Sequence, residues 1–275
     1  MILRHRAVGS ILHLAQRGEY IRIMLPKMSA LSIVLTFLLP GSTPTLQRTR
    51  LAEYPDLMLW AWERNENLSF IDPKNAGVAF LAGTVNLSGD HITVQPRTHS
   101  LEVPPGTTLV AVVRVTSDLQ YPPLYSPRQQ SGTAGEVLSA SRIPGVSGVQ
   151  IDFDARTSDR AFYRSLLHDV RALLPESTSL SITALASWCL GDPWIRDLPV
   201  DDAVPMLFRM GPDRRTVLED IEEGRDFSSA VCRHSIGIST DELSPLPSFK
   251  RRLYVFNPKP WTEDVYRKYL NGVPQ

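Results

Sequence analysis

The sequence predicts a single (β/α)8 barrel over residues 52–275. Short apolar segments rich in β-branched residues alternate with helical segments from residue 55 onward, a pattern typical of a parallel sheet built from βα units. Eight such strands fit into about 225 residues, the usual size of this barrel. The turn after the first strand, residues 63–66, has no glycine, whereas an open doubly wound sheet usually carries a glycine-rich phosphate turn there.

Eight apolar segments are long enough for the barrel strands, and turn-forming residues separate them. An additional hairpin strand is expected at His91–Arg97, because Ser88-Gly89-Asp90 precedes it as a turn signal. The barrel strands are expected at Leu57–Trp62, Gly77–Thr84, Thr108–Thr116, Gly148–Asp154, Leu180–Trp188, Ala203–Met210, Ser235–Ser239 and Leu253–Phe256.

The clearest helix is expected at Ser158–Leu174, where apolar residues recur at helical spacing until Pro175 ends the segment. Gly132 and Gly135 weaken the helical pattern of a segment earlier in the chain. Further helices are expected at Arg128–Ser141, Asp192–Leu198, Arg214–Glu223 and Trp261–Leu270.

Residues 1–44 differ from the rest of the chain. A basic stretch is followed by an apolar run at Ala30–Leu39, which spans about 15 Å as a helix and is too short to cross a bilayer. That arrangement favours a signal peptide or an uncleaved membrane anchor, with an amphipathic helix of the fold as the alternative. We therefore expect an exported protein, either periplasmic or membrane-anchored and facing the periplasm.

The charge balance gives no reason to expect a nucleic-acid partner, since 29 Lys and Arg residues match 29 Asp and Glu residues. No cofactor and no metal site are expected, because the six histidines are scattered and the two cysteines lack ligand spacing. Cys189 is expected near the mouth end of the barrel and Cys232 near the opposite end. In an exported protein two cysteines could pair, but this separation argues against a disulfide and predicts that they stay unpaired.

The fourth strand carries the sharpest functional signal. Val149, Ile151 and Phe153 alternate with Gln150, Asp152 and Asp154, so one face is apolar and the other polar. The apolar face is expected to pack under the helices, while the polar face points into the barrel and rises to its mouth, where active sites of such barrels lie. Neighbouring carboxylates raise one pKa, which suits a general acid. The alternative is a structural pair bonded to Arg114 or Arg209.

Other polar and aromatic residues are expected at or near the carboxyl-terminal ends of the predicted strands. Carboxylates, arginines and tryptophans together are a common way to hold sugar rings. The expected substrate-binding residues are Trp62, Glu63, Arg114, Trp188, Arg209, Asp241, Glu242, Asn257 and Trp261.

The segment Ser147–Asp154 resembles the fourth-strand motif D-G-x-D-x-D-x-E of the chitinase-like glycoside hydrolases, whose last glutamate is the general acid. Asp152 stands at the last aspartate of that motif and Asp154 at the glutamate. Ser147 and Gln150 stand where the family has aspartates. The resemblance implies a glycoside hydrolase barrel, and these departures put the strength of the acid and a substrate-assisted route in doubt.

A longer resemblance, to the bacterial domain of unknown function 3142, covers most of residues 57–260. It implies the fold and a bacterial source, because the family has no established activity. The segments that carry it are Leu59–Arg64, Val149–Arg156, Thr183–Trp188, Val204–Gly211 and Ile238–Glu242.

Together these observations favour a glycoside hydrolase-like barrel that acts on a cell-envelope or extracellular polysaccharide. Asp154 is the expected general acid and Asp152 the assisting carboxylate. The alternative is a non-catalytic exported carbohydrate-binding barrel with a degraded active site. A metal-dependent hydrolase is disfavoured, because no histidine is expected at the mouth. The sequence makes no prediction about oligomeric state.

Overall fold

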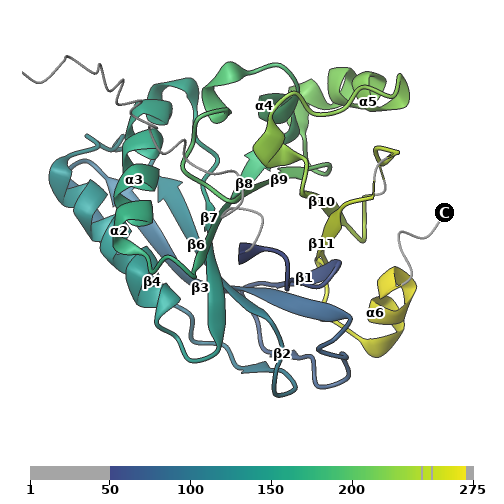
Figure 1. Cartoon of the computed structure of the whole chain (residues 1–275). Coiled ribbons are helices and arrows are strands. Elements are labelled where there is room, and N and C mark those ends of the chain that lie inside the picture. Colours follow the sequence, from purple (N-terminus) through teal and green to yellow (C-terminus); the bar gives the residue numbers. More distant parts are fainter. Residues whose placement is uncertain (1–49, 243, 249, 271–275) are drawn as a thin grey trace, which may run out of the picture. The chain divides into compact units, whose positions relative to one another are not determined.

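The chain forms a closed barrel of eight parallel strands (Figure 1). The computed structural model describes residues 50–242, 244–248 and 250–270, so the expected signal or anchor segment at residues 1–44 lies outside the described residues. Pairing of β1 with both β11 and β3 closes the ring, which confirms the predicted barrel. The barrel strands are β1 (Leu57–Ala61), β3 (Ala76–Ser88), β6 (Leu109–Ser117), β7 (Val146–Asp152), β8 (Ser179–Leu185), β9 (Asp202–Met206), β10 (Ser235–Ser239) and β11 (Arg252–Phe256).

Helices lie outside the ring of strands (Figure 1). The expected hairpin strand is β4 (His91–Pro96), antiparallel to the end of β3, and β2 (Glu66–Asn67) pairs with β5 (Leu101–Glu102) in a separate small sheet. Within the described ranges, no helix is long and apolar enough to cross a membrane. The helices are α2 (Pro127–Ser141), α3 (Arg160–Leu173), α4 (Ala186–Leu190), α5 (Arg214–Glu222) and α6 (Glu263–Leu270).

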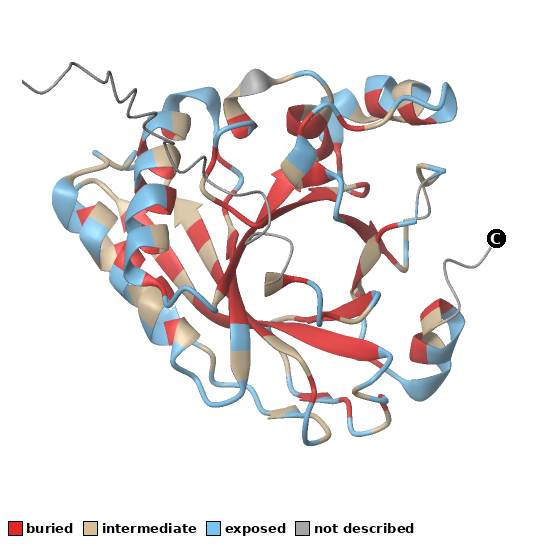
Figure 2. Ribbon diagram, viewed as in Figure 1, coloured by how far each residue is buried: buried red, intermediate tan, exposed pale blue. Residues whose placement is uncertain are grey.

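Side-chain alternation divides the core into two layers, one inside the barrel and one between strands and helices. Val149, Ile151 and Phe153 of the β7 segment pack in the outer layer with the helices. Gln150 points inward, where its Oε1 accepts a hydrogen bond of 2.9 Å from Trp60 Nε1. Most residues of the barrel strands are therefore buried on both faces, as Figure 2 shows. The predicted two faces of the fourth strand are confirmed.

A glycine makes room for the largest side chain inside the barrel. A Cβ added at Gly237 on β10 would lie 2.8 Å from the Trp60 ring, closer than side chains tolerate. Trp60 lies beside Tyr254 and Phe208, with ring centroids 5.2 Å and 6.2 Å away. The indole thus fills the barrel centre directly below the mouth.

Helix α2 forms although two glycines interrupt its helical pattern. Ser126 caps it, because its side chain accepts from the Gln129 N–H and Gln129 reaches back to the Ser126 N–H. A Cβ added at Gly132 would lie 2.7 Å from Ile92 Cδ1, so this glycine lets α2 approach β4 closely.

Four strands end earlier than the sequence predicts. Strand β1 ends one residue early, at Ala61, and β7 ends two residues early, at Asp152, so that Asp154 lies beyond the strand. The larger differences are in β8 and β9. The fifth strand, β8, ends at Leu185, and residues up to Leu190 form α4 instead, so that Trp188 leaves the sheet. The sixth strand, β9, ends at Met206, and Phe208 and Arg209 lie on the turn that follows it. The expected helix at Asp192–Leu198 is only the 3-10 turn Pro193–Ile195.

The prediction that the cysteines stay unpaired is wrong. Cys189 and Cys232 form a disulfide with Cα atoms 5.8 Å apart. Because β8 ends early, Cys189 lies on α4 outside the barrel, where its carbonyl accepts from the Ser228 N–H. The chain after α5 returns past this helix before β10 begins, so Cys232 reaches the same place.

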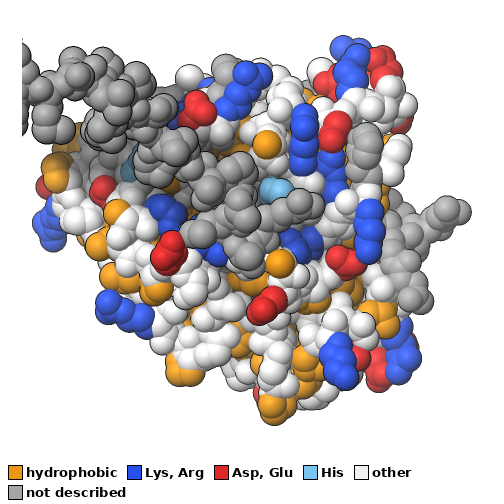
Figure 3. All heavy atoms as spheres, viewed as in Figure 1, with side chains coloured by type: hydrophobic (Ala, Val, Ile, Leu, Met, Phe, Trp, Pro, Cys, Tyr) orange, Lys and Arg blue, Asp and Glu red, His pale blue; other side chains and the backbone are white. Residues whose placement is uncertain are grey.

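The surface carries mixed charge. On the face drawn in Figure 3, basic and acidic side chains of the described residues are interspersed, in keeping with the balanced composition.

Candidate functional site

A pocket of about 280 Å³ opens at the carboxyl-terminal ends of the barrel strands. This is the end where barrel enzymes place their active sites. Acidic, basic and aromatic side chains line it: Trp60, Trp62, Arg114, Asp152, Asp154, Thr183, Leu185, Met206, Phe208, Arg209 and Phe256.

Asp152 is the half-buried carboxylate at the end of β7. Its side chain is 16% exposed. One oxygen, Oδ1, accepts a hydrogen bond of 2.7 Å from Thr183 Oγ1 on β8. The other, Oδ2, lies 3.9 Å from Arg114 Nε on β6. Burial raises the pKa of Asp152 to about 6, with a smaller contribution from the charge of Asp154, while Thr183 and Arg114 lower it.

Asp154 lies beyond the end of β7, with an exposed side chain on the pocket wall. The described residues give it neither a hydrogen bond nor an ion pair. Arg114 and Arg209 therefore do not seal the aspartates into a closed salt-bridge cluster. Both carboxylates face a space that a ligand can enter.

Aromatic rings form the opposite wall of this pocket. Phe208 and Phe256 stack with ring centroids 5.8 Å apart and planes only 2° from parallel. Trp62 meets Phe256 edge-on at 6.3 Å, and Trp60 lies below them. Flat apolar surface beside carboxylates suits the face of a sugar ring, which is apolar on its C–H side.

Two arginines border the pocket. Arg114 lies between two carboxylates, since its Nη1 is 3.7 Å from Glu63 and its Nε is 3.9 Å from Asp152. Arg209 lies over Phe256, with its guanidinium carbon 5.0 Å from the ring centroid. Its Nη2 is 3.7 Å from the exposed Asp241.

The remaining expected acidic residues lie beside the pocket lining. Glu63 is exposed next to Arg114 and borders a neighbouring hollow. Asp241 pairs with Arg209, whereas Glu242 accepts the Arg209 backbone N–H at 3.0 Å and pairs with Arg214. Asp241 is thus exposed at the rim of the pocket, while Glu242 fixes the turn that carries Arg209.

Trp188, Asn257 and Trp261 lie in the interior, apart from the lining of the mouth pocket. Trp188 packs against Trp194, with ring centroids 5.0 Å apart. Trp261 donates from Nε1 to the carbonyl of Trp60 at 2.9 Å, and Asn257 accepts from Thr240 at 2.7 Å. These contacts brace the loops that follow the strands.

Sequence reasoning missed several lining residues. Trp60 and Thr183 sit on inward-facing strand positions, so extending the alternation argument beyond the fourth strand would have identified them. The signal for Phe208 and Phe256 was weaker, because neither has polar neighbours that alternate with apolar ones. Phe208 follows β9, and Phe256 is the last residue of β11. The missed lining residues are Trp60, Thr183, Leu185, Met206, Phe208 and Phe256.

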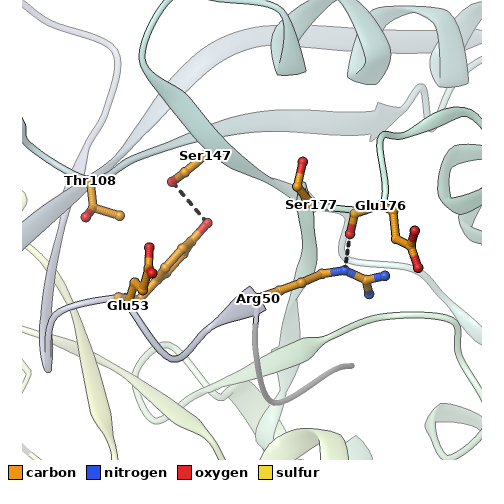
Figure 4. A pocket seen from close by; sticks show the side chains of 7 residues that line it. Arg50, Glu53, Thr108, Ser147, Glu176 and Ser177 are labelled. Atoms are coloured by element: carbon orange, nitrogen blue, oxygen red, sulfur yellow. Dashed lines mark hydrogen bonds between the residues drawn. The ribbon is translucent and has the colours of Figure 1, made fainter. Parts of the chain in front are cut away.

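A larger hollow of about 800 Å³ lies at the amino-terminal end of the strands. Figure 4 shows Arg50 beside Glu176 and Ser177, with Thr108 and Ser147 across from them. Its polar groups bind one another: Arg50 pairs with Asp201 and donates to the Glu176 carbonyl. This network fixes the base of the barrel, whereas the acidic pair lies at the mouth.

Within the described ranges, no group of three or more His, Cys, Asp or Glu side chains is placed to share a metal ion.

Residues 105–228 match the family described as domain of unknown function DUF3142. This stretch is less than half of the chain and contains the aspartate pair. It confirms the expected resemblance over these residues. No curated protein matches the sequence.

Solved structures with a similar fold include a Streptomyces coelicolor protein assigned as chitinase A. It has a TM-score of 0.52 and 11% identity over 80% of this chain and 97% of that chain. The spore cortex-lytic enzyme SleL of Bacillus cereus has a TM-score of 0.44 and 14% identity, over 66% of this chain and 50% of that chain. A family GH18 chitinase from Chromobacterium violaceum has a TM-score of 0.44 and 11% identity, over 74% of this chain and 78% of that chain. The first of these likenesses supports the barrel fold of this chain.

Proposed function

We propose that the mouth pocket binds and cleaves a polysaccharide of the cell envelope or the extracellular space. The observation that carries this proposal is that Asp152 and Asp154 line one open pocket together with an aromatic wall. Asp154, the exposed member, is placed to reach a glycosidic oxygen and acts as the general acid. Asp152 assists it from the base of the pocket.

The electrostatics of the pair support this division of roles. With the pKa of Asp152 raised to about 6, a proton stays in the pocket at mildly acidic pH. In the proposed step Asp154 protonates the leaving oxygen, and Asp152 beside it supplies the proton. Glu63 or Asp241 at the rim would then activate water.

A second candidate function is sugar binding without turnover. Gln150 stands where the chitinase-like motif has an aspartate, and its side chain is committed to Trp60 and Ser181 inside the barrel. The site therefore lacks a third carboxylate on this strand, and the acid has the shorter side chain of aspartate. These departures favour a degraded active site that retains its aromatic wall.

We also propose that the protein works outside the cytoplasm, periplasmic or held at the membrane by its first 44 residues. The basic and apolar pattern of that segment supports this placement. The Cys189–Cys232 disulfide supports it independently, because disulfides persist in oxidising compartments.

The test is a screen of the purified protein against bacterial polysaccharides, with both reducing-end release and binding measured. Asp154→Asn should reduce release at least a hundredfold and leave binding within about threefold. Asp90→Asn, which alters an exposed carboxylate in the β3–β4 turn, is the matched control and should match the native protein. Binding without release by the native protein would establish the second candidate. Absence of both would overturn the proposal.

A further inference from the structure

Arg209 is held in a backbone conformation that arginine rarely adopts. Its φ is 51°, in the left-handed region, and among the described residues other than glycine only Tyr125 shares a positive φ. The Arg209 N–H donates to Glu242 Oε2 at 3.0 Å, and Glu242 is itself fixed by Arg214. Strain that the surroundings maintain in this way is concentrated at binding and catalytic positions.

The side chain of Arg209 contacts two aromatic rings on one side and is exposed to solvent on the other. Its guanidinium carbon lies 5.0 Å from the Phe256 centroid and 5.9 Å from the Phe208 centroid, over a pair of stacked rings. The side chain is 56% exposed. The described residues supply no hydrogen bond to the guanidinium, and its one ion pair, with Asp241, is 3.7 Å long and half-exposed. Such a pair is weak and easily exchanged.

The strained backbone and the stacked rings therefore present a planar set of N–H donors to the pocket that contains the aspartate pair. A guanidinium supported by a cation–π contact can keep N–H groups free for a ligand, and the planar guanidinium edge matches the two oxygens of a carboxylate. A ligand carboxylate could replace Asp241 there and make two short hydrogen bonds instead of one long ion pair. A neutral sugar hydroxyl would gain much less.

We propose that Arg209 forms a subsite for the carboxylate of an acidic sugar, so that the glycan taken by this pocket carries uronic acid units. This inference rests on the proposed function and narrows its substrate class. The sugar that bears the carboxylate would lie on the Phe208–Phe256 side of the pocket, with the aspartate pair across from it.

The test compares acidic oligosaccharides with the same chains after chemical reduction of their carboxyl groups. The probes are tetragalacturonate and tetramannuronate, each beside its neutral carboxyl-reduced counterpart, with affinity measured by titration calorimetry. The native protein should bind at least one acidic probe tenfold or more tightly than its reduced counterpart.

Arg209→Gly removes the guanidinium at a position where glycine adopts the observed φ without strain, so the variant should fold normally. It should lose at least tenfold in affinity for the acidic probe and less than twofold for the neutral one. Arg209→Lys keeps the charge without the planar edge. Its affinity for the acidic probe should lie between those of the native protein and Arg209→Gly. Arg215→Gln, an exposed arginine of α5 outside the pocket, should bind like the native protein.

Equal affinity of the native protein for acidic and reduced probes would overturn the subsite and leave the proposed function intact. If Arg209→Gly lost affinity equally for the acidic and the reduced probe, the subsite would likewise be overturned and the proposed function would stand. A native protein that binds neither these probes nor any polysaccharide of the screen would overturn both proposals.

Discussion

Thr183 Oγ1 donates a hydrogen bond of 2.7 Å to Asp152 Oδ1 and so joins β8 to β7 at the mouth of the barrel. The bond stabilises the charged carboxylate, whereas burial stabilises the protonated form. The balance leaves the pKa of Asp152 at about 6.

Thr183→Val should raise the pKa of Asp152 above 6, because the variant keeps the shape of the side chain and removes the donor. The carboxyl carbon signal of Asp152, followed by NMR through a pH titration, measures the shift directly. Thr93→Val, at an exposed position of β4, is the control and should leave the titration unchanged. An unchanged midpoint in Thr183→Val would show that the bond does not tune the acid.

Asp202 should make the protein less stable as pH rises. Ser235 donates to its Oδ2 at 2.6 Å, while the described residues give Oδ1 no hydrogen-bond partner. Burial raises the pKa of Asp202 to about 7, so between about pH 4 and 7 the folded state holds a proton that the unfolded chain releases. The free energy of unfolding therefore falls across that range.

Asp202→Asn, neutral at every pH, should gain stability relative to the native protein between pH 4 and pH 8, by up to about 4 kcal/mol. Urea unfolding at several pH values measures this change. Asp201→Asn is the contrasting variant, because Asp201 binds Arg50, Arg171 and the Leu180 N–H. It should lose about 3–5 kcal/mol at pH 7. A constant difference between Asp202→Asn and native protein from pH 4 to 8 would refute the assignment.

Gly237→Ala should destabilise the barrel by about 1–3 kcal/mol, because the new methyl group would meet the Trp60 ring at the base of the pocket. Gly135→Ala is the control, since nothing lies within 4 Å of its added methyl and it sits in α2. That control should gain about 0.5–1 kcal/mol. Thermal unfolding, followed by Trp fluorescence, measures both changes in stability. Equal stability of the two variants would contradict the close packing of Gly237 against Trp60.

The disulfide encloses a long stretch of chain, with 43 residues of sequence separation between Cys189 and Cys232. Replacing both by alanine should lower the free energy of unfolding by about 4 kcal/mol, the chain-entropy value for a loop of this length. Urea unfolding with and without a reducing agent measures it. If reduction leaves the native protein as stable as before, the bond does not contribute.

The alternation of apolar strand segments with helical segments was enough to predict the eight strands. The period of two in the fourth strand was enough to predict the inward-facing Gln150 and Asp152. The strand ends were less predictable. Trp188 and Cys189 continue an apolar run, and only tertiary packing turns them into α4. Arg209 could be placed at the mouth, but its left-handed backbone depends on Glu242, which lies 33 residues away in sequence.

The pH dependence of reducing-end release is the most direct test of the claim that Asp152 supplies the proton that Asp154 delivers. The account predicts release that is highest below about pH 6 and falls about tenfold per pH unit above it, since the proton is lost through the raised pKa of Asp152. In Asp152→Asn this inflection should disappear. A native profile that stays flat between pH 5 and pH 8, or one that Asp152→Asn leaves unchanged, would contradict the account.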